Sequence, residues 1–155
     1  MDNPLWEYSL AGYREAGVAE TCLALQDTFG VDVNLLLYAA WLAARNQCLS
    51  ADHLLALDER VREWRETVVK PLRALRRDLR DYPQAAGVRD ELKALELRAE
   101  REQQDMIYLF YESAAEPVRE ANPLLNNLTE AVLIARPQTG DWDGAIRHLA
   151  ALLAP

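Results

Sequence analysis

The part of the sequence that most resembles a binding site is a set of polar side chains around Gly30. Gln26, Asp27, Asp32 and Asn34 lie within nine residues of one another, on both sides of this glycine. Because N–H groups at the start of a helix can bind an anion, these four residues are candidates for contact with a ligand or a partner. They also have a structural interpretation, which we favour: Asp32 caps a helix, and Gly30 adopts a positive φ angle at the joint between two helices.

The histidines and cysteines do not have the spacing of a metal site or a catalytic site. Neither His53 nor His148 follows a glutamate by three residues, as the ligands of a carboxylate di-iron site do. Cys22 and Cys48 form no Cys-x-x-Cys pair, and Cys22 lies on an apolar helical stripe where a thiol stays protonated. The sequence therefore predicts no metal and no cofactor, identifies no catalytic residue, and favours a protein that is not an enzyme.

A second candidate surface is the segment 60–80, which carries eight basic and three acidic residues in a chain of formal net charge −8. Exposed arginine beside tyrosine and tryptophan is typical of protein interfaces, so we consider a protein-binding role for this segment. The candidate residues are Arg73, Arg76, Arg77, Arg80 and Tyr82. Nucleic-acid binding through the same arginines is an alternative that the acidic net charge disfavours.

The arginines have a third interpretation, as ion-pair partners of an acidic helix that runs antiparallel to their own. In the register that a tight turn would impose, Arg73 lies level with about Glu96 and Arg80 with about Asp90. Much of the positive charge would then be paired inside the molecule and would not form a binding surface.

These candidates depend on helices that the apolar pattern predicts. In the segment 33–44 only Asn34 is polar, so we expect a helix that is buried on every side. Its twelve residues are too few to span a membrane, which takes about 20, so we place it at the centre of a protein core.

The longest apolar pattern predicts a helical hairpin. Leucine, valine and tryptophan recur at steps of three and four from Leu54 to Leu79, and a second helical pattern covers the segment 88–114. Between them, the segment Tyr82–Gly87 is predicted to form a turn, so we expect an antiparallel hairpin over 51–114. Pro71 interrupts the first pattern without changing its phase, which predicts a kink near residues 68–70.

Residues 1–155 are expected to form a single all-α domain, a bundle of about six or seven helices with a central apolar helix. The N-terminal residues lack the basic and apolar regions of a signal peptide, and no segment could span a membrane. Together with two cysteines that look unpaired, this favours a cytoplasmic protein.

The stretch LQDTFGVDVNLLLYAAW, residues 25–41, with LWEYSLAGY and GVAETC before it, resembles an uncharacterised family of helical proteobacterial proteins classed only as a domain of unknown function. Its signature is similar to LQDxxGxDVNLLLxxxW. The resemblance implies a bacterial cytosolic protein and implies no catalytic residue, cofactor or substrate.

Taken together, the sequence leaves the biochemical function open between three classes. The first choice is a non-catalytic protein-interaction or adaptor domain with an unidentified protein partner. A small-molecule-binding domain that uses the Gly30 corner is the alternative, and a nucleic-acid-associated protein is the third class. Homodimerisation through the hairpin also stays open.

Overall fold

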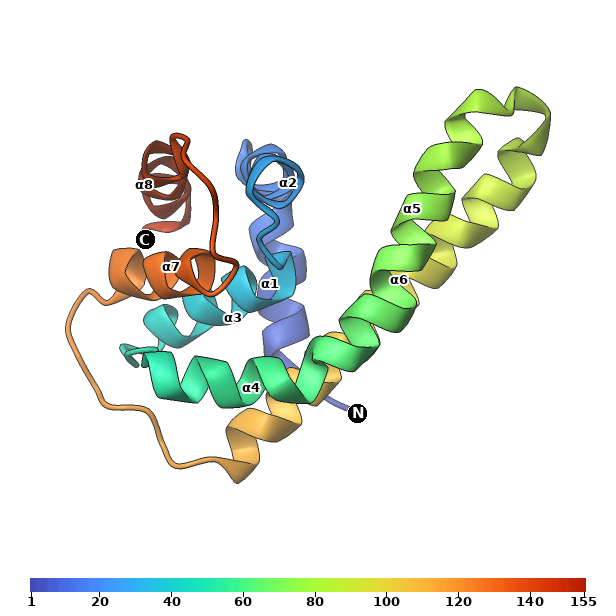
Figure 1. Cartoon of the computed structure of the whole chain (residues 1–155). Coiled ribbons are helices and arrows are strands. Elements are labelled where there is room, and N and C mark those ends of the chain that lie inside the picture. The colour runs from blue at the N-terminus through green and yellow to red at the C-terminus, as the bar shows by residue number, and fades with distance from the viewer.

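The computed structural model describes all 155 residues and is built from helices, turns and loops (Figure 1). It has no strand, and its one β-type pairing is an isolated bridge between Gln47 and Arg119. The α-helices are α1 (Pro4–Arg14), α2 (Val18–Phe29), α3 (Val33–Ala44), α4 (Ala51–Trp64), α5 (Lys70–Asp78), α6 (Ala86–Ser113), α7 (Leu124–Leu133) and α8 (Trp142–Leu153). Because α4 continues into α5 without a break, these eight helices form seven rods, and the predicted all-α bundle is confirmed.

The centre of the molecule is α3, as its sequence predicts. All of its residues except Ala44 are buried, and α7 packs along it while α1, α2 and α6 also contact it (Figure 1). The core cluster of 24 buried side chains draws its largest group from this helix. None of the helices has both the length and the apolar character that crossing a membrane requires.

The kink predicted before Pro71 is present and takes the form of a π-helix. Between α4 and α5 the backbone widens over Arg65–Val69, where the N–H of Lys70 donates to the carbonyl of Arg65. A single π-turn of this kind shifts the hydrogen-bond pattern by one residue, which accommodates a proline that has no N–H to donate. The rod bends at this point and points α5 away from the core (Figure 1).

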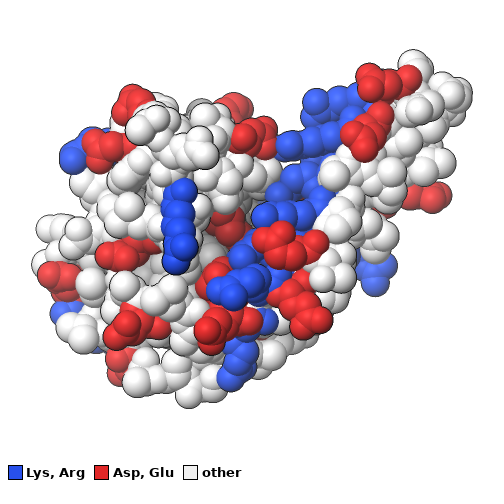
Figure 2. Space-filling model, in the orientation of Figure 1, with Lys and Arg blue, Asp and Glu red and all other residues white.

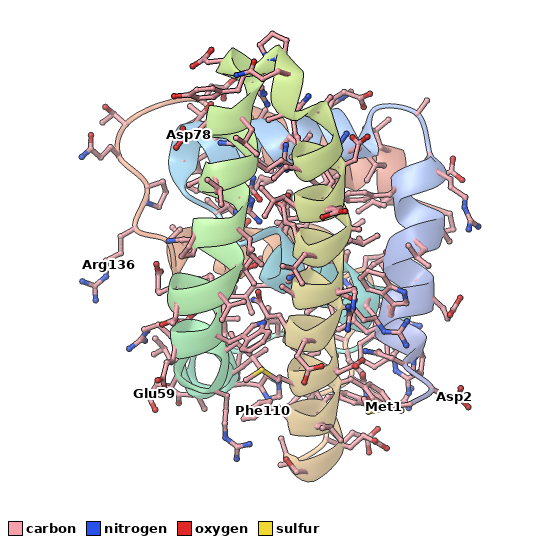
Figure 3. All side chains as sticks on the ribbon, turned by 90° about the vertical axis from the view of Figure 1, so that its right-hand side faces the viewer. Met1, Asp2, Glu59, Asp78, Phe110 and Arg136 are labelled. Atoms are coloured by element: carbon pink, nitrogen blue, oxygen red, sulfur yellow. The ribbon has the colours of Figure 1, made fainter.

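The hairpin consists of the α4–α5 rod and α6, joined by two short 3₁₀ turns over Leu79–Asp81 and Pro83–Ala85. Figure 3 shows the two rods side by side, from Asp78 near the tip to Phe110 near the other end. The inner half of the hairpin is held in the molecule by five buried residues of α6, which are Glu96, Ala99, Gln103, Gln104 and Ile107. The outer half extends from the core, and α5 has no buried residue at all.

The C-terminal helices pack on the core through apolar side chains, and α7 is also joined to it by one buried amide, that of Asn127. Its side-chain oxygen accepts from the N–H of Leu49 at 2.8 Å, and its nitrogen donates to the carbonyls of Ala39 at 3.1 Å and Gln47 at 2.9 Å. Asn127 is fully buried, so water cannot replace these partners. This one side chain therefore joins α7 both to α3 and to the loop that follows α3.

Replacing Asn127 with alanine should lower the free energy of unfolding by about 3 kcal/mol or more, because three buried backbone groups lose their partner. Urea unfolding followed by helical circular dichroism measures this. The neighbouring Asn126 is exposed, so Asn126→Ala is the matched control and should change stability by less than about 0.5 kcal/mol. Equal effects of the two substitutions would contradict this account of the joint.

Candidate functional site

Asp32 lies in the Gly30 corner, the joint between α2 and α3 that carries Gln26, Asp27, Asp32 and Asn34. It caps α3 and also contacts the hairpin. One carboxylate oxygen accepts from the N–H groups of Asn34 at 2.8 Å and Leu35 at 3.4 Å. The other accepts from the guanidinium of Arg65 at 3.0 Å and from the side-chain amide of Gln103 at 2.7 Å. The cap agrees with the sequence prediction, whereas the two hairpin partners were not predicted.

The other corner residues also face the hairpin. Asn34 is buried and accepts a hydrogen bond at 3.1 Å from Gln104 on α6, whose amide also contacts the hydroxyl of Ser9 on α1. Asp27 is exposed and accepts from Arg77 at 2.6 Å, and the pKa of Asp27 is lowered by that bond. Gly30 itself has a φ of 69°, a left-handed conformation that closes α2 and that glycine adopts without strain.

Three of the four candidate arginines are paired within the chain. Arg73 lies 3.3 Å from both Glu96 and Glu100, and Arg76 also pairs with Glu96. The predicted register of Arg73 and Glu96 is therefore confirmed. Figure 2 shows the resulting band of basic side chains along the side of the hairpin that faces the rest of the molecule.

The remaining two members of that candidate set lie at the tip of the hairpin. Arg80 is exposed and makes no ion pair, so the predicted pairing with Asp90 is absent. Tyr82 is 53% exposed. The candidate surface thus divides into an inner part and an exposed tip. In the inner part, Arg73 and Arg76 join α5 to α6, and Arg77 joins the hairpin to α2.

Between the hairpin and the N-terminal helices lies a cleft with a volume of about 450 Å³. Its apolar wall is formed by Trp6, Leu10, Leu23, Leu37 and Leu97. Its polar lining is formed by Ser9, Tyr13, Gln26, Asp32, Asn34, Arg73, Arg76, Lys93, Glu96, Glu100 and Gln104. The sequence-predicted corner residues Gln26, Asp32 and Asn34 are therefore brought together with Arg73 and Arg76 across one space.

A smaller hollow of about 220 Å³ adjoins the cleft and shares Gln26, Asp32 and Arg73 with it. Gln103 and Arg77 also line this hollow. The carbonyl oxygen of the Gln103 side chain and the Nε of Arg77 are buried and have no hydrogen-bond partner. Buried polar atoms are satisfied in the great majority of cases, so these two atoms are exceptions among the side chains around the hollow.

The cleft is lined by three basic side chains, Arg73, Arg76 and Lys93, and by three acidic side chains, Asp32, Glu96 and Glu100. Burial raises the pKa of the Glu100 carboxyl, as does the nearby Glu96, against the opposing effect of Arg73. Lys93 is exposed at the rim and forms no ion pair. Lys93 is therefore the basic side chain of the cleft that no carboxylate of the chain neutralises.

The opposite side of the hairpin carries a second groove, of about 670 Å³, which shares no lining residue with the cleft. It is lined by Trp64, Thr67, Val68, Pro71, Leu72, Leu75, Leu95, Arg98, Ala99, Arg101 and Glu102. Leu75 is 49% exposed and Leu95 is 45% exposed. Figure 3 looks onto this side of the hairpin, which faces away from α2.

The histidines and cysteines are not brought together. His53 contacts the hydroxyl of Tyr38 at 2.7 Å and stacks on its ring, and burial lowers the pKa of His53. Cys22 is buried, which raises the pKa of its thiol to about 12 and keeps it protonated. No group of three or more histidine, cysteine, aspartate or glutamate side chains has an arrangement that could hold a metal ion.

Residues 4–107 match the sequence profile of a family described as a protein of unknown function, DUF2390. The chain belongs to this family. No curated protein and no solved structure matches it. The matched segment runs from the start of α1 into the buried half of α6, so it contains every residue that lines the cleft and the outer groove. The resemblance predicted from residues 25–41 is thereby confirmed as membership of a family of unknown function.

Asp32→Ala should cost more stability than the loss of an ordinary helix cap. A lost cap costs about 0.5 to 2 kcal/mol, and here a largely buried arginine and Gln103 lose a partner as well, so we expect about 2 to 4 kcal/mol. Asp141 caps α8 through one bond to the N–H of Gly144 and is exposed, so Asp141→Ala is the control at about 1 kcal/mol. Unfolding in urea gives both values, and equal values would show that Asp32 acts as a cap alone.

Proposed function

We propose that this protein is a non-catalytic docking protein whose hairpin binds an amphipathic helix of a partner protein in its outer groove. The observation that carries the proposal is an inverted distribution of side chains on α5. The Arg73 and Arg76 side chains are only 18% and 16% exposed, whereas Leu75 between them in sequence is 49% exposed. On α5, the arginines therefore face the cleft and Leu75 faces the outside, which favours a surface that a second molecule covers.

The dimensions of the outer groove fit one helix. It extends along the rod from Trp64 to Leu75, a distance of about 17 Å at 1.5 Å per residue, which corresponds to roughly three turns of a partner helix. Parallel walls of two helices with an apolar floor are the usual receptor for the i, i+3, i+4 stripe of an amphipathic helix.

The rim of the groove selects the charge of the partner. Arg98 is exposed and makes no ion pair, whereas Arg101 lies over the ring of Trp6 and its Nε is 3.6 Å from the carboxylate of Asp105. Glu102 is the single acidic residue among the lining residues. A helix with leucine-like side chains on one face and acidic side chains along its flank is therefore the occupant we propose.

We propose that the tip of the hairpin, with Arg80 and Tyr82, makes a further contact with the same partner. Arg80 and Tyr82 are free to bind, while Arg73, Arg76 and Arg77 are engaged by carboxylates of the same chain. The same engagement weakens the nucleic-acid alternative, because phosphate binding would have to replace these ion pairs. The two free cysteines support a reducing compartment, so we place the partner in the cytoplasm.

The test begins with a photoreactive residue, p-benzoylphenylalanine, in place of Leu75, and with a control chain that carries it in place of Leu109. Both leucines are about half exposed, but Leu109 lies outside the groove. Cross-linking in the source cell and mass spectrometry should identify an amphipathic, acidic helical segment attached at position 75 and not at position 109. A cross-link from position 75 to a second copy of this chain would replace the proposal with a homodimer.

The identified segment is then made as a labelled peptide and its affinity is measured by fluorescence anisotropy. Leu75→Gln together with Leu95→Gln should weaken binding by about tenfold to hundredfold, because both side chains lose apolar burial. Leu109→Gln together with Leu133→Gln removes two leucines of similar exposure elsewhere and should leave the affinity unchanged. Arg80→Ser with Tyr82→Ser tests the tip and should weaken binding less. Equal affinity of the groove variant and its control would reject the groove.

A further inference from the structure

The cleft on the inner side of the hairpin has the features of a small-molecule site that the docking function does not use. Its volume of about 450 Å³ falls within the range of about 300 to 1,000 Å³ that is usual for ligand pockets. One wall is apolar and contains Trp6, Leu10, Leu37 and Leu97. The opposite wall carries the ion-paired arginines and glutamates of the hairpin, so the cleft separates apolar and polar surfaces.

The polar wall is fixed in place before any ligand binds. Glu96, whose side chain is 9% exposed, holds Arg73 and Arg76, and Asn34 is held by Gln104. Such restraint lowers the conformational entropy that a ligand would have to remove from these side chains. Arg73 divides its contacts between two carboxylates at 3.3 Å each, so an incoming anion could replace one of them.

Two observations point to a negative head group. Lys93 stands at the rim without an ion pair, and the raised pKa of Glu100 favours its uncharged form beside Arg73. Arg73 and Arg76, which also line the cleft, carry further N–H donors. A carboxylate supplies acceptors for such donors and forms the stronger, charge-assisted type of hydrogen bond.

We propose that the cleft binds a small amphipathic carboxylate, with its apolar body against Trp6, Leu10, Leu37 and Leu97 and its head group towards Arg73, Arg76 and Lys93. The ligand would contact α1 and α3 on one side and both helices of the hairpin on the other. This site shares no lining residue with the proposed docking groove, and the two are linked by the contact of Arg101 in the groove with Trp6 in the cleft.

Two tryptophans can report which hollow a ligand enters, because Trp6 lines the cleft and Trp64 lines the outer groove. The probe is octanoate, titrated into ¹⁵N-labelled protein while the indole N–H signals are followed by NMR. Trp6→Phe and Trp64→Phe assign the two signals. Octanoate should shift the Trp6 signal in a saturable manner and leave the Trp64 signal in place. Absence of a Trp6 shift, or a shift of Trp64 alone, would overturn the proposal.

The charge at the rim of the cleft and its apolar wall are tested separately, with matched variants on α6. Lys93→Gln should weaken octanoate binding about threefold to tenfold, and Leu97→Gln about fivefold or more, whereas Arg98→Gln and Leu109→Gln should not change it. All four residues are exposed, so none of these changes should unfold the protein. Octyltrimethylammonium, which has the same chain and the opposite charge, should bind more weakly than octanoate. Equal binding of both probes, or equal affinity in all four variants, would refute recognition of a carboxylate in the cleft.

Discussion

The constraint on which the whole structure depends is that α3 is apolar on every side. A helix of this kind has no face that is stable in water, so other elements of the chain must enclose it. Leaving α3 uncovered would greatly reduce stability, because exposing one buried leucine side chain to water costs about 1.5 to 3 kcal/mol of folding free energy. The arrangement of α1, α2, α6 and α7 around α3 satisfies that requirement. The outer half of the hairpin, which includes α5, is the part of the chain that this enclosure does not need.

The position of the hairpin follows from polar contacts at the start of α3 and along the cleft. Asp32 lies where α3 begins, and its second oxygen binds Arg65 in the π-helix and Gln103 in α6. Further out, Asp27 binds Arg77. Outside the buried half of α6, charged and amide side chains therefore fix the angle of the hairpin.

The sequence predicted those features that depend on residues close together in the chain. The all-round apolar character of α3, the cap at Asp32 and the kink before Pro71 are all local patterns, and each is present. The buried role of Asn127 was not predicted, because its three partners lie 78 to 88 positions away and Asn126 has the same side chain. A single sequence gives no signal for which of two adjacent asparagines faces the core.

The candidate site shows the same division between local and distant information. The corner residues and the arginines were identified by type and spacing, but their meeting across a cleft depends on the angle of the hairpin. Periodicity predicted the stripe that contains Leu75 but could not say whether this stripe would be covered. A helical pattern shows that a face is apolar and does not show what it packs against.

The orientation of the hairpin also bears on whether its exposed leucines have a function. An extension that served only to support the core would turn its apolar face inward, where burial of leucine would add stability. Here Glu96 and two arginines occupy the inward face with side chains that are only 9 to 18% exposed. The desolvation of such largely buried ion pairs offsets their attraction, so apolar side chains of similar size are often as stabilising or more so. Stability alone therefore favours the opposite orientation to the one that the structure adopts. The hairpin instead has fixed polar groups next to the cleft and open apolar side chains on the outside, an arrangement suited to binding on both of its faces.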